Sequence, residues 1–162
     1  MATMWLLDCG WPPSAAQRAG GFQFWCSADG QRGRAYAAQA VAPAGNWTAL
    51  ECLQAIDGRA SGAVAECHYT VETDVPHEHE SELNAWYEQE HLPGLAAVPG
   101  TIRAMRYRRL SGSPLYLACY DLLSPATIER PEWLAVRHTA WSSRVRPHFR
   151  NTRRTLHFRG EA

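Results

Sequence analysis

Apolar and polar residues alternate along several short segments of this chain, and turn residues separate the segments from one another. The alternation predicts strands at residues 3–9, 34–41, 47–56, 63–75, 102–110, 115–123 and 152–158. Turn-forming stretches such as Pro43-Ala-Gly45 and Ser111-Gly-Ser-Pro114 lie between them. The pattern therefore predicts a sheet of short strands joined by tight connections.

Three segments lack this alternation and are predicted to be helical. Ser14 can cap a weak helix that runs to about Trp25. Pro76 suits a first helical position, the acidic residues that follow favour the start of a helix, and Pro93-Gly94 is expected to end it, which gives a helix at about residues 77–92. Pro131 precedes a further helix at about residues 132–144.

From Ala63 onward the predicted order is β-α-β-β-α-β, the order of a ferredoxin-like α+β domain with both helices on one face of an antiparallel sheet. The other face of that sheet needs a partner. We interpret residues 1–62 as a degenerate β-α-β-β half-repeat of residues 63–162, so that the two form a (pseudo)dimeric α/β barrel. The alternative is that residues 1–62 are an extension and that a second identical chain covers the sheet as a homodimer.

The half-repeat rests on three loose matches. Arg34-Ala35 corresponds to Arg103-Ala104, and both pairs are followed by two strands. Two further correspondences link Cys52 to Cys119 and Trp25 to Trp86.

Charge and cysteine usage narrow the class of protein. The formal net charge is zero, which gives no reason to expect nucleic acid or membrane as a partner. Residues 66–90 hold eight acidic residues and no arginine, whereas residues 101–162 hold twelve arginines and four acids, so the two segments can attract each other. Five cysteines without a C-x-x-C pair favour reduced thiols, and the N-terminal residues have no signal-peptide pattern, so we expect a cytoplasmic protein.

The helix at residues 77–92 carries the first candidate chemistry. Leu83, Trp86, Tyr87 and Glu90 recur with the spacing of one helix face, so a carboxylate continues an apolar stripe. His91 follows in the last turn, where it could work with Glu90 as an acid and base pair. The plainer interpretation makes Glu90 a boundary residue that reaches solvent.

The predicted strand that follows Glu66 carries a second set of candidate catalytic residues. Alternation sends Cys67, Tyr69 and Val71 to one face and His68, Thr70 and Glu72 to the other, and the second set is too polar for an ordinary core. With His91 and Tyr107, this face could line a cavity in which a proton is moved next to a carbonyl group. A structural sheet histidine and a core tyrosine are the plainer interpretations of His68 and Tyr107.

No metal site is expected, because His77, His79 and His91 lie on different sides or turns of the predicted helix. No phosphate-binding loop, nucleophile elbow or dinucleotide fingerprint is present, and we expect no cofactor.

At Trp86-Tyr-Glu-Gln-Glu-His-Leu-Pro93, Val98-Pro-Gly100 and Tyr107 the chain resembles the dimeric α/β-barrel superfamily, and within it the EthD-like proteins. The resemblance implies two ferredoxin-like sheets packed face to face, with a pocket inside the barrel or between a sheet and its helices. It also implies a functional histidine on the first strand and another near the end of the first helix, which here match His68 and His91.

These observations lead to one main hypothesis and two alternatives. The main hypothesis is a cofactor-independent cyclase, isomerase or lyase acting on a small hydrophobic carbonyl, phenolic or polyketide-like compound. His91 is its acid or base, Glu90 orients it, and His68 and Tyr107 assist. The side chains expected to contact the substrate are those of Trp86, Tyr87, Tyr69, Thr70 and Glu72. The alternatives are a non-catalytic small-molecule-binding or accessory protein and a monooxygenase of the same superfamily.

Overall fold

In the computed structural model, residues 2–161 are described and form eight strands. The strands are β1 (Thr3–Gly10), β2 (Phe24–Ser27), β3 (Arg32–Gln39), β4 (Thr48–Asp57), β5 (Cys67–Asp74), β6 (Thr101–Arg109), β7 (Tyr116–Leu122) and β8 (Arg150–Arg159). They pair antiparallel in the order β1-β3-β2-β8-β5-β7-β6-β4 and close into a barrel. Closure within one chain leaves no strand edge of the sheet without a partner.

The barrel consists of two four-stranded halves with the same strand order. The second half runs β8-β5-β7-β6 and the first runs β4-β1-β3-β2, so in each half the first and third strands are central and the second and fourth lie at the edges. The edge strands join the halves through the pairs β2–β8 and β4–β6. The fold is thus a ferredoxin-like α+β domain that completes an α/β barrel with its own degenerate half-repeat.

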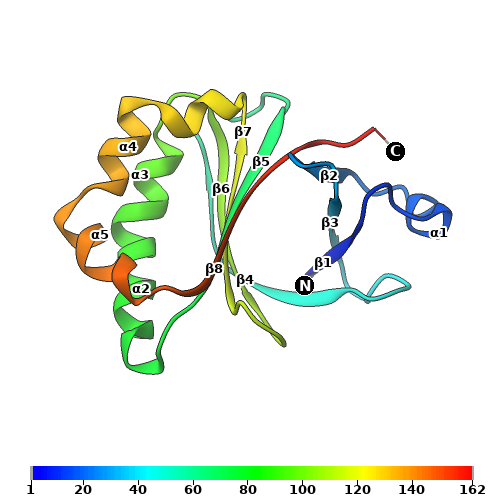
Figure 1. Cartoon of the computed structure of the whole chain (residues 1–162), viewed down its shortest axis with the longest axis horizontal. Helices are drawn as coiled ribbons and strands as arrows, with labels where there is room; N and C mark the ends of the chain where they lie inside the picture. The colour runs from blue at the N-terminus through cyan, green and yellow to red at the C-terminus, as the bar shows by residue number, and fades with distance from the viewer. Residues whose placement is uncertain (1, 162) are drawn as a thin grey trace.

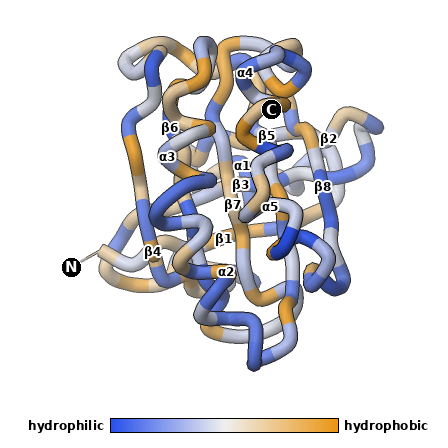
Figure 2. The backbone as a smooth tube through the Cα atoms, turned by 90° about the vertical axis from the view of Figure 1, so that its left-hand side faces the viewer, coloured by the Kyte–Doolittle hydropathy of each residue, from blue (hydrophilic) through white to orange (hydrophobic). Residues whose placement is uncertain are grey.

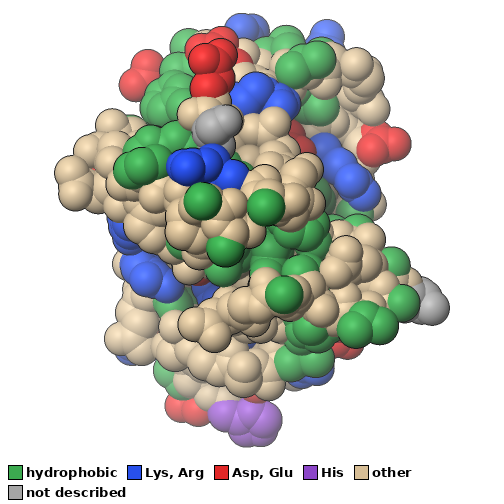
Figure 3. All heavy atoms as spheres, turned by 90° about the vertical axis from the view of Figure 1, so that its right-hand side faces the viewer, with side chains coloured by type: hydrophobic (Ala, Val, Ile, Leu, Met, Phe, Trp, Pro, Cys, Tyr) green, Lys and Arg blue, Asp and Glu red, His purple; other side chains and the backbone are tan. Residues whose placement is uncertain are grey.

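The two long helical segments cover the second half (Figure 1, left). The first helical segment contains η1 (His77–His79), α2 (Glu80–Trp86), a π-helical turn η2 (Tyr87–His91) and α3 (Leu92–Ala96). The second contains η3 (Pro125–Glu129), α4 (Pro131–Arg137), α5 (Ala140–Val145) and η4 (Arg146–His148). The outer face of the first half has only the short helix α1 (Ala15–Arg18) and connecting loops, and hydrophobic side chains reach the surface on that side (Figure 3).

The first helical segment continues past Pro93, so the prediction that Pro93-Gly94 ends it is wrong. The Leu92 N–H donates to the carbonyl of Tyr87, five residues earlier, in the π turn. Pro93 then lies in the first turn of α3, where a missing N–H and a fixed φ are tolerated. The helix ends at Ala96, and Gly100, whose φ is 99°, makes the turn into β6.

The helix predicted from Ser14 to Trp25 is mostly absent. Ser14 does cap it, with the Ser14 hydroxyl accepting from the Gln17 N–H and the Gln17 side chain accepting from the Ser14 N–H. The helix nevertheless stops at Arg18, because Gly20-Gly21 follows and Gly21 has a φ of 70°. The first half therefore has one strand more than expected, since residues 24–27 form β2.

The helix predicted for residues 132–144 is divided in two. Its break lies at His138 and Thr139, where the Thr139 hydroxyl accepts from the Ser142 N–H and starts α5 as a new helix. Trp133, buried in α4, and Val145, buried in α5, both pack toward the sheet.

The matches proposed for the half-repeat are one strand out of step. Arg34 lies on β3, the third strand of its half, whereas Arg103 lies on β6, the second strand of the other. Cys52 on β4 and Cys119 on β7 are likewise not equivalent, and Trp25 is on a strand while Trp86 is on a helix. The repeat is one of topology, and these residue matches do not identify its register.

Apolar cores form on both faces of the second half. The larger fills the space between helices and sheet and includes Leu83, Trp86, Leu92, Tyr120 and Trp133. Hydrophilic and hydrophobic positions alternate along the helices that cover it (Figure 2), as expected for amphipathic helices. The smaller core fills the middle of the barrel and consists of Leu6, Leu50, Met105, Tyr107, Leu117 and Cys119, with Met4 and Tyr36 against it.

None of the helices in the described part of the chain has the length and apolar character needed to cross a bilayer. The five cysteines are all present as free thiols.

Candidate active site

Strand β5 divides its side chains between the two cores as the alternation predicts. Cys67 and Tyr69 face the helices, whereas His68 lines a cavity inside the barrel. Thr70 and Glu72 share the inner face with His68 and are buried there. β5 therefore places three polar side chains on the inner face of the barrel.

His68 is held by a carboxylate on the neighbouring strand. Asp121 of β7 lies directly opposite His68 of β5 in the strand register. The Nδ1 of His68 and the Oδ1 of Asp121 are 2.7 Å apart. An ionised carboxylate only accepts hydrogen bonds, so Nδ1 carries the hydrogen, and in the neutral ring Nε2 is the acceptor. His68 has 3% of its side chain exposed and Asp121 has 25%, so the pair is reached from one side through the carboxylate.

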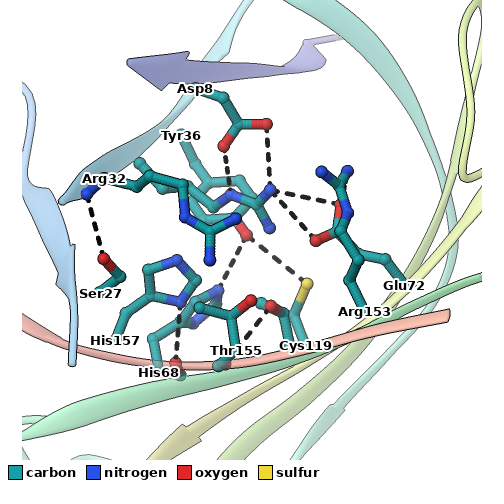
Figure 4. A network of polar contacts seen from close by, with 12 residues as sticks. Asp8, Ser27, Arg32, Tyr36, His68, Glu72, Cys119, Arg153, Thr155 and His157 are labelled. Atoms are coloured by element: carbon teal, nitrogen blue, oxygen red, sulfur yellow. Dashed lines mark hydrogen bonds and ion pairs between the residues drawn. The ribbon is translucent and has the colours of Figure 1, made fainter. Parts of the chain in front are cut away.

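Tyr36 reaches His68 from the opposite half of the barrel. Its hydroxyl, on β3, lies 2.8 Å from the Nε2 of His68 and 3.6 Å from the Sγ of Cys119 (Figure 4). Trp25 of β2 stacks on the His68 ring with centroids 5.2 Å apart. Tyr36, His68 and Asp121 thus form one hydrogen-bonded series across the barrel, with the imidazole in the middle.

These groups lie on a cavity of about 240 Å³. Its walls are formed by Met4, Gln23, Trp25, Tyr36, His68, Arg103, Met105, Tyr107 and Asp121. Methionine and aromatic side chains supply most of the surface, and among the described residues that line it Arg103 is the one arginine. A cavity with apolar walls and a few convergent polar groups is the usual form of a small-molecule site.

Both tyrosines of the cavity remain phenols at neutral pH. Burial raises the pKa of Tyr36 well above its ordinary value, and the nearby Cys119 thiol adds to the effect. Burial likewise raises the pKa of Tyr107. Their hydroxyl groups can therefore donate hydrogen bonds to an oxygen atom of a ligand.

A second histidine, His157 of β8, lies beside His68 with ring centroids 6.0 Å apart. Its pKa is lowered to about 4 by burial, by Arg34 and by His68. His157 is therefore neutral near pH 7 and does not oppose a positive charge on His68.

His91 lies on the other face of the sheet, so the expectation that it shares a cavity with His68 and Tyr107 is wrong. Its ring stacks on Trp86 at 4.1 Å between centroids, in a hollow of about 30 Å³ between helices and sheet. Burial, with Arg146 and Arg137 nearby, lowers its pKa to about 3, and its Nδ1 has no hydrogen-bond partner within residues 2–161. His91 thus lies outside the barrel cavity, between the first helical segment and the sheet.

Glu90 does not orient His91. Its Oε2 accepts a hydrogen bond of 2.8 Å from the hydroxyl of Thr139. Because Thr139 also caps α5, Glu90 ties the first helical segment to the second. This contact is closer to the boundary role considered for Glu90 than to the catalytic one.

The residues expected to contact a substrate are divided between three places. Tyr69, Trp86 and Tyr87 line the small hollow around His91, on the helix side. Thr70 is fully buried inside the barrel, where its hydroxyl lies 3.5 Å from the carbonyl of Thr155. Glu72 takes part in an ion-pair network further along β5. Of the nine predicted residues, only His68 and Tyr107 line the 240 Å³ cavity.

The sequence reasoning missed Tyr36, Asp121 and Trp25. Asp121 has a usable signal, because it is an acid on the same strand face as Leu117 and Cys119, in a run that is otherwise apolar. Nothing in the local sequence marks Tyr36 or Trp25 as a site residue, since their roles depend on closure of the barrel by the first half.

Within residues 2–161, no three His, Cys, Asp or Glu side chains are grouped closely enough to hold a metal ion. The 240 Å³ cavity is also below the roughly 300–1,000 Å³ typical of pockets for drug-sized ligands, so its residues do not fit a macrocycle such as haem.

No model of a protein family matches this chain, and no curated protein matches it by sequence. Solved structures with the same fold do match it. A major regulator of staphylococcal pathogenesis superposes with a TM-score of 0.72 at 8% identity, over 99% of this chain and 100% of the other.

Two structures from Listeria monocytogenes are similar to the chain as well. One is a ferredoxin-fold protein described as related to antibiotic biosynthesis monooxygenases, with a TM-score of 0.68, 8% identity and coverage of 100% of this chain and 97% of the other. The second is a heme-degrading enzyme, with a TM-score of 0.66, 9% identity and coverage of 98% and 99%. At these identities the likeness establishes the shared barrel fold alone.

Proposed function

We propose that the protein is a cofactor-independent acid–base enzyme that removes a proton from a small hydrophobic carbonyl or phenolic compound bound inside the barrel. His68 is the base, Asp121 orients and stabilises it, and Tyr36 and Tyr107 donate to the substrate oxygen. The chemistry is that of an isomerase, cyclase or lyase. Membership of the EthD-like group is part of this proposal.

The observation that carries the proposal is the hydrogen-bonded series Tyr36–His68–Asp121 on the wall of the cavity. The carboxylate fixes the tautomer, so Nε2 faces the group that will lose or receive the proton.

The cavity also indicates the class of substrate. Apolar and aromatic walls favour a flat hydrophobic ligand, and about 240 Å³ suits one or two rings. Arg103 lies on the same cavity and can attract an anionic oxygen on such a ligand.

The proton transfer follows from these positions. In the free protein the Tyr36 hydroxyl occupies Nε2 of His68. A ligand oxygen that accepts from Tyr36 instead would release Nε2 to take a proton from the adjacent carbon. The resulting imidazolium would be paired with Asp121, and the enolate oxygen would accept from Tyr36 and Tyr107.

Proton exchange tests this step without knowledge of the natural substrate. The probe is 2-tetralone, an aromatic ketone with acidic α-protons, incubated with the protein in D₂O and followed by NMR. We expect the protein to accelerate exchange, and His68→Gln to lower the acceleration by about 10²–10⁴-fold, the usual contribution of a general base.

His91→Gln is the matched control, because it changes a histidine equally buried but on the helix side of the sheet. It should retain the wild-type exchange rate. Exchange that survives in His68→Gln but disappears in His91→Gln would reverse the assignment. Binding of the ketone without exchange would favour the non-catalytic carrier.

Oxygen chemistry is the second candidate, and it is favoured by solved structures of this fold that are described as monooxygenase-related or heme-degrading. A phenolate or enolate formed by His68 is also the species that molecular oxygen would oxidise. An oxygen electrode separates the two candidates, because only the oxidation consumes oxygen when a phenolic probe is added.

A further inference from the structure

Arginines and carboxylates gather around Glu72, further along β5 from His68. Glu72 is 2% exposed and accepts a 2.6 Å hydrogen bond from Nη2 of Arg109. Arg34 binds Asp8 through Nε and Nη2, at 2.6 and 3.0 Å, and its Nη2 also lies 3.3 Å from Glu72. Arg153 approaches Glu72 at 3.6 Å. The two carboxylates are therefore fully engaged by guanidinium groups.

This cluster surrounds a second cavity of about 80 Å³, whose lining includes Arg32, Arg34, Arg153, Thr155 and His157. In Figure 4, Arg32 reaches this region from β3, and Arg153, Thr155 and His157 reach it from β8. The carboxylates of Asp8 and Glu72 line the cavity as well, and Arg109 binds Glu72 at 2.6 Å. Four arginines and two carboxylates therefore make up the cluster, which leaves a surplus of two positive charges.

The site also contains hydrogen-bonding capacity that the described protein groups do not use. Nη1 of Arg34 is buried and has no partner within residues 2–161, although the Arg34 side chain is only 5% exposed. Leaving a charged donor unpaired in a protein interior is costly. His157 donates from Nδ1 to the carbonyl of His68 at 3.3 Å, so its Nε2 is an acceptor, and the donors available to a bound anion come from the arginines and Thr155.

We propose that this second cavity is a binding site for a small oxyanion, the carboxylate or phosphate group of a ligand. The guanidinium groups of Arg32, Arg34 and Arg153 would hold the oxygen atoms, and Thr155 would donate its hydroxyl.

The structure favours an anion over a cation because the carboxylates that a cation would need already accept from arginines. A guanidinium group also matches the geometry of carboxylate and phosphate oxygens. The volume of about 80 Å³ admits the charged group alone, so any larger ligand would extend toward the exposed Asp8 and Arg153 side chains.

Inorganic phosphate and acetate are the probes, each titrated at constant ionic strength with sodium chloride. Calorimetry gives the affinity, and the ring signals of His157 and His91 in NMR spectra give the location. We expect the His157 signal to shift and the His91 signal to stay, since His91 lies on the other face of the sheet.

Arg153→Gln and Arg32→Gln test the site without disturbing the buried Arg34, because both side chains are exposed enough to be replaced. Each should weaken binding by about tenfold, the loss expected for one charge-assisted contact. The control is Arg108→Gln, which removes an arginine of similar exposure, 46% against 48%, from an ion pair with Glu51.

A preference for phosphate or for acetate would identify which oxyanion the site holds. The proposal is overturned by dissociation constants above about 10 mM for both probes, by a His157 signal that does not move, or by equal losses in Arg153→Gln and Arg108→Gln. These measurements do not involve 2-tetralone exchange, so they stand or fall separately from the proposed acid–base function.

Discussion

His68 and Asp121 face each other directly across β5 and β7, and their side chains are joined at 2.7 Å. The contact brings together residues 53 positions apart in the chain. Because directly opposite side chains of an antiparallel pair point to the same face, the strand register itself places the carboxylate at Nδ1. The orientation of the imidazole is therefore fixed by the sheet rather than by a loop.

Asp121→Asn should change which ring nitrogen of His68 carries the hydrogen. The amide can donate as well as accept, so it no longer selects the Nδ1–H tautomer. We expect ¹⁵N NMR of the wild-type protein to show a predominant Nδ1–H form and the variant to show a mixture. An unchanged tautomer ratio would mean that Asp121 does not orient the ring.

Tyr36→Phe should cost about 1 kcal/mol of unfolding free energy, the net value of one buried hydrogen bond. The same substitution at Tyr107 is the control, because Tyr107 packs in the same barrel core but is not one of the side chains bonded to His68. Urea denaturation measures both. In 2-tetralone exchange, Tyr36→Phe should also slow the reaction, since the enolate loses one donor. Equal stability losses in the two variants would argue against a specific Tyr36–His68 contact.

Glu72→Gln should lower the unfolding free energy by about 3–5 kcal/mol, the usual cost of removing one partner of a buried ion pair. Arg34 and Arg109 would remain charged in the barrel without this carboxylate. Glu51→Gln is the matched control, because the Glu51–Arg108 pair is about half exposed and should contribute less than about 1 kcal/mol. Chemical denaturation at neutral pH compares the two, and a similar small loss in both would contradict the ion-pair network.

His91 should make the protein less stable in acid. Its pKa is about 3 in the folded state against an ordinary value of 6.5. Between these values the unfolded chain binds a proton that the folded chain does not, so stability falls as the pH falls below the ordinary value. His91→Leu should reduce the stability lost between pH 7 and pH 5 by about 2 kcal/mol.

Denaturation curves at pH 7 and pH 5 give the unfolding free energy of each protein at both values. A change in packing alters this free energy equally at the two pH values, so the difference between them reports only the effect of protonation. The same loss in the variant as in the wild type would show that His91 can be protonated in place.

Local patterns in the sequence accounted for much of the scaffold. Alternation on β5 correctly sent His68, Thr70 and Glu72 to one face, because side chains of a strand alternate whatever the strand packs against. The β-α-β-β-α-β order of the second half was likewise predicted from turn residues and periodicity. Strand β2 was not predicted from the sequence, because its four residues are too few to display an alternating pattern.

The candidate site was less accessible from the sequence. His91 lies on a helical segment that packs on one face of the sheet, whereas the His68 side chain points to the other face. No local sequence pattern indicates which face of a sheet a helix will cover. Glu90 illustrates the same limit, because its partner Thr139 belongs to a helix break 49 residues away.

The sequence by itself determined the strands, the face of β5 that carries polar groups and the need for a second sheet to cover it, since these depend on neighbours in the chain. Only the tertiary structure decided that the first half supplies that sheet, that Tyr36 and Asp121 meet His68, and that His91 lies outside the barrel. Those contacts join residues far apart in the chain, and their geometry follows from how the strands close into a ring.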